Sequence, residues 1–279
     1  MENDFKHALV IPLFGELKRE CLYRLNAWMH HGFWVVVVNN NPIGSSMQGV
    51  CANTIVYNHN HQGLAGGLNA GVTAAVADGA RCITLLDQDS IISVESLRYL
   101  AKECGQDVVI GPQIVDKIRQ TDHTQACAST RILISSGTTF KRSTWQRIGS
   151  FKGWMEIDYI DHEWCSRARS VGVNLKVSYQ AKLIQTFGKR HPNDFAHFIG
   201  LQLYSPYRRA IALRNLRWLI LQRIVPFDIR LKELIKMLLK PWIWLLIEPD
   251  RKSCLTVIWL GITAPLNKPF PRGPLDRLK

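Results

Sequence analysis

Between Ala8 and Ser90, short apolar runs alternate with segments of helical spacing, and this alternation limits the folds open to the chain. Runs rich in β-branched residues, of which Phe33 to Val38 is the clearest, predict buried strands. Between these runs, apolar residues recur at spacings of three and four, which predicts helices. Strands and helices that alternate in this way are typical of a mostly parallel sheet flanked by helices. We therefore expect an α/β fold.

The predicted elements can be given as residue ranges. Strands are expected at 8–11, 33–38, 50–57, 82–86, 108–111, 131–135, 175–178 and 181–186. Helices are expected at about 17–28, from 64 to the glycine at 79, at 94–103, and from Asp161 as N-cap to the glycine at 172. The strand at 82–86 delivers two aspartates at its carboxyl end, which is the edge of an open α/β sheet where ligands bind.

The composition changes at about residue 205, where arginines and lysines begin to alternate with leucines and tryptophans. Cationic amphipathic helices are expected from that pattern. We predict a catalytic domain at 1–204 and a basic helical segment at 205–279. The longest apolar runs, 242–247 and 254–266, are shorter than the ~20 residues that span a bilayer, so no transmembrane helix is expected.

The net charge and the cysteines indicate the compartment and the partners. The chain has 35 Lys and Arg against 22 Asp and Glu, a formal charge of +13. This excess favours a polyanionic neighbour: nucleic acid, an anionic membrane, or phosphate-bearing substrates. The seven cysteines form no CxxC pair or zinc pattern, and the N-terminus lacks a secretory signal, so we expect a cytoplasmic protein. Nucleic acid is not expected as a partner, because no helix-turn-helix, RNP or zinc pattern is present.

The first acidic motif is Leu85-Leu86-Asp87-Gln88-Asp89-Ser90. Two aspartates separated by one residue after a buried strand can direct carboxylate oxygens to one Mg²⁺ or Mn²⁺ ion. Such an ion would neutralise charge that develops on a departing nucleotide diphosphate. The alternative is a structural role, because aspartates also form turns and cap helices.

Two further motifs contain polar or flexible residues. In the glycine-rich stretch from Gly63 to Gly71, Asn69 could contact a nucleotide, although Gly66 and Gly67 would also suit close helix–sheet packing. Its spacing is neither that of a Walker loop nor that of a dinucleotide fingerprint. Farther along, Ser136-Gly137 could line a donor or acceptor site, although a turn would explain it equally well.

The order of these motifs resembles the family 2 glycosyltransferases. The likeness is strongest to the bacterial rhamnosyltransferase branch, in which Leu-Asp-Gln-Asp-Ser and a pattern similar to Asp158-Tyr159-Ile160-Asp161-His162-Glu163-Trp164-Cys165 occur. It covers about residues 8–215. The resemblance implies a GT-A fold, inversion at the anomeric carbon, a nucleoside diphosphate sugar donor, and Mg²⁺ or Mn²⁺. By resemblance alone the donor is expected to be dTDP-rhamnose, with a UDP-sugar as the alternative.

The resemblance also implies roles for residues. Asp89 is expected to be the chief metal ligand, with Asp87 on the metal or the ribose. Asp161 matches the general base, with Glu163 and Asp158 as alternatives. Further contacts with the donor are expected from the following residues: Pro12, Asn39, Asn40, Gly63, Asn69, Ser136, Gly137, Arg208 and Arg214. For any single arginine, a place on a solvated basic helix face is the alternative.

Three positions depart from the family pattern. Asn39 stands where the family usually has Asp, and His61 where it usually has Asn. Gln185 stands where a downstream histidine usually binds the metal, and His191 lies close enough in sequence to substitute. A glutamine can still offer a carbonyl oxygen to a metal. These departures bear on the donor more than on the reaction class.

The sequence as a whole predicts an inverting, metal-dependent glycosyltransferase of cell-surface polysaccharide synthesis. Its acceptor is expected to be a glycan or a lipid-linked saccharide at the inner face of the plasma membrane, where the basic segment would dock peripherally on anionic lipid. That segment could instead form a helical subdomain or an oligomer contact. A nucleic-acid-binding protein, and a nucleotidyltransferase or hydrolase with the same metal carboxylates, are the rival hypotheses.

Overall fold

The computed structural model describes residues 6–43, 47–115, 126–185, 189–190, 202–248 and 250–271. The chain forms two compact units, one of residues 1–153 with 164–186 and the other of residues 154–163 with 187–279. The predicted domain boundary near residue 205 stays a prediction.

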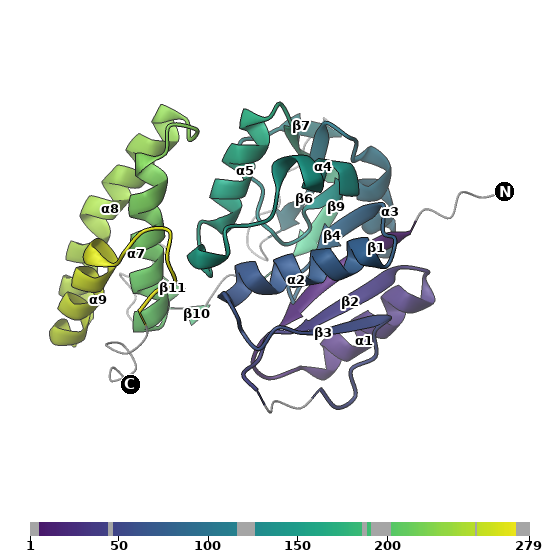
Figure 1. The fold of residues 1–279 in the computed structure, drawn as a ribbon, viewed down its shortest axis with the longest axis horizontal. Coiled ribbons are helices and arrows are strands. Elements are labelled where there is room, and N and C mark those ends of the chain that lie inside the picture. The colour runs from purple at the N-terminus through teal and green to yellow at the C-terminus, as the bar shows by residue number, and fades with distance from the viewer. Residues whose placement is uncertain are drawn as a thin grey trace. The chain divides into compact units, whose positions relative to one another are not determined.

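The first unit contains the α/β fold (Figure 1). Its strands are β1 (His7–Leu13), β2 (Trp34–Asn39), β3 (Thr54–Tyr57), β4 (Cys82–Leu85), β5 (Ile91–Ile92), β6 (Val108–Val115), β7 (Cys127–Ser129), β8 (Thr139–Lys141) and β9 (Asn174–Ile184). Its helices are α1 (Arg19–His30), α2 (Gly63–Ala77), α3 (Val94–Glu103), α4 (Arg142–Ile148) and the greater part of α5 (Ile160–Ser170).

These strands form one sheet in the order β3-β2-β1-β4-β8-β6-β9-β5, with β7 paired to β9. The first four strands in this order are parallel, whereas β8 runs antiparallel to both of its neighbours. The chain builds outward from β1 to β2 and β3, and then returns through α2 to place β4 on the other side of β1. This reversal of strand order lies at the carboxyl ends of β1 and β4, where ligands of open α/β sheets bind.

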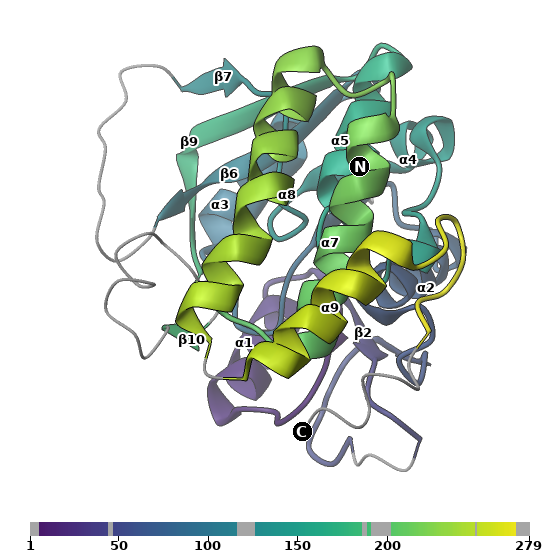
Figure 2. The ribbon, with the colours of Figure 1, turned by 90° about the vertical axis from the view of Figure 1, so that its left-hand side faces the viewer.

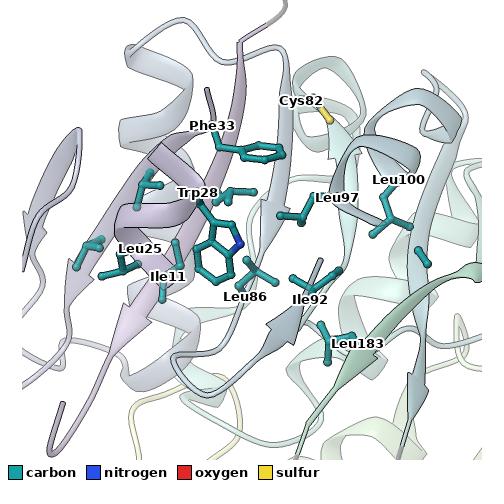
Figure 3. Packing of buried hydrophobic residues seen from close by; sticks show 14 of the residues in the cluster. Ile11, Leu25, Trp28, Phe33, Cys82, Leu86, Ile92, Leu97, Leu100 and Leu183 are labelled. Carbon is teal, nitrogen blue, oxygen red and sulfur yellow. The ribbon is translucent and has the colours of Figure 1, made fainter. Parts of the chain in front are cut away.

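Alternation along β1 sends side chains to both faces of the sheet. Leu9, Ile11 and Leu13 join residues of α1 and α3 in one buried cluster (Figure 3). On the other face, a Cβ added at Gly71 of α2 would lie 2.4 Å from a methyl group of Val10. The absence of a side chain at Gly71 therefore lets α2 pack closely on the sheet.

Most predicted elements of this unit are confirmed, and α3 has the predicted bounds. The strand expected at 131–135 is wrong, because the chain turns there: the amide of Thr138 donates to the carbonyl of Ser135, and Gly137 has a φ of 82°. The strand forms after the turn, as β8. The two strands expected at 175–178 and 181–186 are one strand, β9, with a register shift opposite Pro112 and Gln113.

The second unit is mostly helical (Figure 2). It contains the short strands β10 (Lys189–Arg190) and β11 (Gln202–Leu203) and the helices α7 (Pro206–Leu221), α8 (Phe227–Ile247) and α9 (Arg251–Thr263). Ser205 caps α7 by accepting a hydrogen bond from the amide of Arg208, and Pro206 occupies the first turn. Apolar residues of the three helices share one core that includes Leu213, Trp244 and Val257. Among the described residues, none of the helices is both long enough and apolar enough to span a membrane.

Candidate functional site

The acidic motif lies where β4 ends. Asp87 is half-buried and Asp89 is exposed. The amide of Asp87 donates to the hydroxyls of Ser90 (3.1 Å) and Ser136 (3.3 Å), and these two hydroxyl oxygens are 2.5 Å apart. Ser136, predicted near the donor, therefore lies beside the acidic motif. Ser93, and not either aspartate, caps the next helix by accepting a hydrogen bond from the amide of Ser96, which removes the capping alternative for the aspartates.

Gln185 contacts the acidic motif directly. Its Nε2 donates to Oδ2 of Asp87 at 2.5 Å, and within the described part of the chain its buried Oε1 has no hydrogen-bond partner. A buried acceptor without a partner is costly, so this oxygen favours a donor or a cation beside it. Two carboxylates and an amide oxygen are ligands that Mg²⁺ and Mn²⁺ accept. The residues present therefore fit a hard divalent cation.

Histidine does not complete this set in the described residues. No group of three or more His, Cys, Asp or Glu side chains suited to a metal occurs in the described ranges, and His191 lies outside them. Asp89 is exposed and makes no hydrogen bond or ion pair to any other described residue. The ligand set predicted from Asp87, Asp89, Gln185 and His191 stays a prediction.

Gln88, between the two aspartates, has a role that the sequence analysis missed. Its side-chain amide forms two hydrogen bonds with the backbone of Phe14, accepting from the amide (2.9 Å) and donating to the carbonyl (3.0 Å). Arg24 donates to the backbone carbonyl of Gln88 at 2.7 Å. The segment after β4 is thus tied to the segment after β1. In the sequence, only the position of Gln88 between the two predicted metal ligands pointed to this role.

Three consecutive asparagines, the first of which is the last residue of β2, are all buried. The side chain of Asn39 accepts from the amide of Asn41 at 3.1 Å, and that of Asn41 accepts from Gly15 at 2.6 Å. Asn40 donates to the carbonyl of Gly63 at 3.0 Å. Their described contacts hold neighbouring loops together at the carboxyl edge of the sheet. The predicted donor contacts of Asn39 and Asn40 remain predictions.

The turn before α2 has an unusual backbone. His59, Asn60 and Gln62 have φ values of 51°, 55° and 57°, in the left-handed region that non-glycine residues seldom adopt. A Cβ at Gly66 would lie 1.9 Å from the carbonyl oxygen of His61, so Gly66 permits this tight approach. The glycine-rich stretch thus serves both the turn, through Gly66, and helix–sheet packing.

Three other residues predicted to contact the donor lie within the first unit. The side-chain amide of Asn69 donates to the carbonyl of Phe151 and accepts from its amide, both at 2.9 Å. Pro12 is buried within β1. Gly137 donates to the carbonyl of Leu85 at 2.7 Å, which places it beside the end of β4. Their contacts with a donor stay predictions.

The second acidic motif begins α5. The prediction that Asp161 is the N-cap is wrong, because the helix begins at Ile160 and Asp161 lies in its first turn. Oδ1 of Asp161 accepts from the amide of His162 at 2.9 Å and lies 3.0 Å from Nδ1 of the same residue. The side chain of Asp161 remains 20% exposed, whereas Glu163 is fully buried. Of these two carboxylates, that of Asp161 is the more accessible to an acceptor.

Asp158, the remaining candidate base, forms an ion pair. Its two carboxylate oxygens accept from Nε and Nη2 of Arg208, both at 2.9 Å. Nearby, the hydroxyl of Tyr159 donates to Glu233 at 3.3 Å, a contact that the sequence did not indicate. Burial raises the pKa of Tyr159 well above its usual value, and Glu233 raises the pKa further, so Tyr159 stays protonated at neutral pH.

Arg214 is buried rather than on a solvated helix face. Its guanidinium donates to the carbonyls of Trp154 (2.8 Å) and Lys268 (3.0 Å) and to the side chain of Asn215. Burial lowers its pKa to about 10, although the nearby Glu156 opposes this shift, so the group remains charged at neutral pH. Its predicted contact with the donor diphosphate, like that of Arg208, stays a prediction.

The first unit thus has the features of a nucleotide-binding α/β fold: a reversal of strand order, with two aspartates and an unsatisfied amide oxygen at the carboxyl edge. A family model identifies its class further. The chain belongs to glycosyl transferase family 2, whose model matches residues 9–166. The match includes both acidic motifs.

Relatives support this assignment. The chain is 24% identical to dTDP-rhamnosyl transferase RfbF of Shigella flexneri over 262 residues, which cover 84% of this chain and 86% of the relative. S. aureus TarS 1-349, solved with UDP-GlcNAc, has a TM-score of 0.56 at 13% identity, over 98% of this chain and 83% of that chain. GalNAc-T7, solved with UDP, GalNAc and Mn²⁺, has a TM-score of 0.53 at 12% identity, over 78% of this chain but only 48% of its own. These likenesses show a GT-A fold, as predicted.

Proposed function

We propose that the protein transfers a sugar, with inversion, from a nucleoside diphosphate donor to a hydroxyl group of a glycan or lipid-linked saccharide. The observation that carries this proposal is the exposed carboxylate of Asp89 beside the Asp87–Gln185 pair, in a chain of glycosyl transferase family 2. Rhamnose from dTDP-rhamnose is the proposed donor group, supported by the likeness to RfbF. A UDP-sugar is the alternative, because TarS and GalNAc-T7 were solved with UDP or UDP-GlcNAc.

The metal would be held by Asp89, Asp87 and the amide oxygen of Gln185. When bound, Mg²⁺ or Mn²⁺ supplies positive charge that stabilises the departing diphosphate. To place its oxygen on the ion, the Gln185 amide must turn from the orientation in which Nε2 donates to Asp87. Oxygen and nitrogen of an amide exchange places when its terminal torsion rotates by half a turn, so the same side chain can present either atom at this position. The serines that hold the Asp87 amide keep the motif in place in either state.

A panel of sugar nucleotides tests the donor and the metal together. Binding to the folded state alone raises the melting temperature, so the correct donor should give the largest rise, and Mn²⁺ should increase it. Asp89→Asn should remove the increase caused by Mn²⁺. Absence of stabilisation by every sugar nucleotide, together with salt-sensitive binding to random DNA, would favour the nucleic-acid hypothesis instead.

Asp161 is the proposed general base. Its partly exposed carboxylate can accept the acceptor's hydroxyl proton as that oxygen attacks C1 of the sugar. The amide of His162 orients this carboxylate by donating a hydrogen bond to Oδ1. Asp161→Asn should keep donor-induced stabilisation and lower transfer by about 10²–10⁴-fold, the usual contribution of such a base. Full activity in this variant would refute the assignment.

We propose further that the second unit docks on anionic lipid at the inner face of the plasma membrane. Exposed apolar residues follow one face of α8, with exposures from 46% to 81%. This apolar stripe consists of Phe227, Leu231, Ile235, Leu238, Leu239, Trp242 and Leu246. Their spacings of three and four keep them on one side of the helix, away from the buried Glu233 and Trp244. On α9, Leu255, Trp259 and Ile262 are exposed in the same way.

Positive charge borders the apolar stripe. Lys232, which is exposed, lies next to it, whereas Lys236 forms an ion pair with the buried Glu233 and burial lowers the pKa of Lys240. An in-plane helix with an apolar face and lysines at its edge suits the boundary between acyl chains and anionic headgroups. Each lysine near such a surface contributes about 1 kcal/mol. The same apolar stripe could bind a second copy of the chain, which is the alternative partner.

Sedimentation with vesicles separates these partners. The full chain should sediment with phosphatidylglycerol-containing vesicles and less with phosphatidylcholine alone, and the double variant Leu238→Asp, Trp242→Asp should remain in the supernatant. Tyr23→Asp removes an equally exposed aromatic residue on α1 and should leave sedimentation unchanged. If the double variant instead binds vesicles normally but light scattering gives it a lower molar mass than the wild type, the stripe is a contact between copies of the chain.

A further inference from the structure

The segment Trp154–Tyr159, which leads into the helix of Asp161, has a backbone that its own residues do not favour. Glu156, Asp158 and Tyr159 have φ values of 61°, 55° and 63°, and none of them is glycine. Non-glycine residues in this region are strained, so the conformation persists only where surrounding contacts hold it. The contacts that hold this segment therefore determine how α5 begins.

Asn215 of α7 supplies the most concentrated of these contacts. It is fully buried, and its Nδ2 lies within hydrogen-bond distance of the carbonyl oxygens of Met155 (2.8 Å), Ile157 (2.8 Å) and Asp158 (3.0 Å). An amide nitrogen has two hydrogens, so three carbonyls share two donors. Three of the segment's carbonyl groups are thus directed at one side chain about sixty residues later in the chain.

Arg214 fixes the orientation of the Asn215 amide. Its Nε and Nη2 donate to Oδ1 of Asn215 at 3.1 and 3.0 Å, so the nitrogen must face the segment. Nη2 of Arg214 also donates to the carbonyl of Trp154 at 2.8 Å. If the oxygen and nitrogen of the Asn215 amide exchanged places, the amide nitrogen would face the N–H groups of Arg214, and the amide oxygen would face the carbonyls of the segment. Arg214 and Asn215 therefore act together as one group of hydrogen-bond donors.

Side-chain contacts hold each residue of the segment that has a left-handed backbone. Tyr207 donates to Glu156 at 2.7 Å, Arg208 binds Asp158 through two hydrogen bonds, and Glu233 accepts from Tyr159. The first two contacts come from the first turn of α7. The backbone of the segment and two of these three side chains are therefore held by α7, and the third side chain is held by α8.

We propose that Asn215 is a positioning residue for Asp161, a role that rests on the proposed function of Asp161 as the base. Asn215 does not touch the reacting atoms. By holding the carbonyls of Met155, Ile157 and Asp158, it fixes the direction in which the first turn of α5 leaves the segment. That direction sets the place of the Asp161 carboxylate, and misplacement by about 1 Å costs on the order of 10²-fold in rate.

Asn215→Ala tests this role, with Leu213→Ala as a matched control. Leu213 is also buried on α7, but it packs against Gly261 of α9 and makes no hydrogen bond to the segment. Both variants should lose stability. Only Asn215→Ala should lower kcat, by about 10²-fold, with an unchanged KM for the nucleotide sugar that stabilises the wild type most. Tyr207→Phe, which removes the hydrogen bond to Glu156 and keeps the ring, should lower kcat to a smaller extent.

Hydrogen exchange gives a readout that needs no substrate. In Asn215→Ala the amides of residues 155–163 should exchange at least tenfold faster, while in Leu213→Ala they should exchange as in the wild type. Unchanged exchange there, a kcat within twofold of the wild type, or an equal loss of kcat in Leu213→Ala would overturn the proposal. If Asp161→Asn abolishes transfer while Asn215→Ala is fully active, only the positioning role fails. If Asp161→Asn is fully active, the base assignment fails, and the positioning role fails with it.

Discussion

Two segments of the molecule share a backbone conformation but differ in what holds them. The turn at 58–63 precedes α2 in the first unit, and the segment Trp154–Tyr159 precedes α5 in the second. Each contains three non-glycine residues with φ between 51° and 63°. Each also leads into a helix to which we assign function. The comparison therefore concerns how a strained approach to a helix is stabilised.

The turn at 58–63 is held by its own residues and by Asn39 and Asn40 at the end of β2. The amide of His61 donates to the carbonyl of Asn58, and that of Gly63 to Asn60. The Asn58 side chain donates to the carbonyl of His61 and, at 2.6 Å, to Oδ1 of Asn40. Asparagine tolerates the left-handed region better than most residues, because its short side chain bonds locally. The turn can thus form as soon as α2 and β2 are in place.

The segment 154–159 depends instead on distant residues. Residues of α7 donate hydrogen bonds to Glu156 and Asp158, and Glu233 of α8 accepts one from Tyr159. All of these partners lie about fifty to seventy residues later in the chain. The amide of Phe270, farther still, donates to Glu156 at 3.1 Å. The start of α5 is therefore coupled to the folding of the C-terminal helices. A change in those helices should reach Asp161, whereas the turn at 58–63 should not respond.

The largest effect should come from Arg214→Met. This variant leaves the carbonyls of Trp154 and Lys268 and the oxygen of Asn215 without their donor, and such losses cost about 1–3 kcal/mol each. Because effects in one network do not add, we expect about 3–5 kcal/mol in the free energy of unfolding. Urea denaturation followed by tryptophan fluorescence measures it.

Arg251→Met is the control for Arg214→Met, since Arg251 is exposed at the start of α9. It should change stability by no more than ~0.5 kcal/mol. Hydrogen exchange should rise at 154–160 in Arg214→Met and stay at the wild-type rate at 58–63. Equal increases in both segments would show that the two are not independently held.

The same contrast explains what the sequence could predict. The α/β class and most elements follow from patterns within ten to fifteen residues, and α3, with its N-cap Ser93, shows how sharply local signals define a helix. The aspartates at the carboxyl end of β4 also follow from a local pattern. The strand expected at 131–135 failed because apolar spacing alone does not reveal the turn around Gly137.

Contacts between distant residues could not be predicted. Gln185 lies 98 residues from Asp87, and only the family pattern indicated that they would meet. The family pattern singled out Arg214 as a donor contact, but no local pattern indicated that it is buried while Arg223 and Arg251 are exposed. The N-cap expected at Asp161 failed for the same reason, since contacts with α7 shape the preceding segment and the helix begins at Ile160, two residues earlier than that cap implies.

Gly66→Ala should break the first turn. The added Cβ would lie 1.9 Å from the backbone oxygen of His61, so the turn or the start of α2 must move. We expect a loss of about 2–3 kcal/mol, as for other overpacked sites. Gly105→Ala is the control, because its Cβ would have no neighbour closer than 3.9 Å. Thermal unfolding of both variants measures the difference, and equal melting temperatures would contradict the predicted clash.

Removal of one side-chain contact from each segment should separate local from distant support. Asn58→Ala loses hydrogen bonds to Asn40 and His61, which should cost about 1–2 kcal/mol. Its effect on hydrogen exchange should be confined to residues near 58–66. The effect of Tyr207→Phe should instead appear at 154–160, far from the substitution in sequence. Faster exchange at α5 in Asn58→Ala would show that the first turn also supports the second unit.

The smallest effect, and one of opposite sign, is expected from His59→Gly. His59 is exposed, and its left-handed φ of 51° costs about 1–2 kcal/mol for a residue with a Cβ. Glycine removes that cost but adds about 0.5–1 kcal/mol of chain entropy to the unfolded state. The net gain in unfolding free energy should be about 0.5 kcal/mol.

Tyr159→Gly relieves similar backbone strain but loses the Tyr159–Glu233 hydrogen bond and a half-buried ring, so it should destabilise the protein. Chemical denaturation of the two variants should therefore give changes of opposite sign; a loss of stability in both would mean that the turn at 58–63 also depends on its side chains.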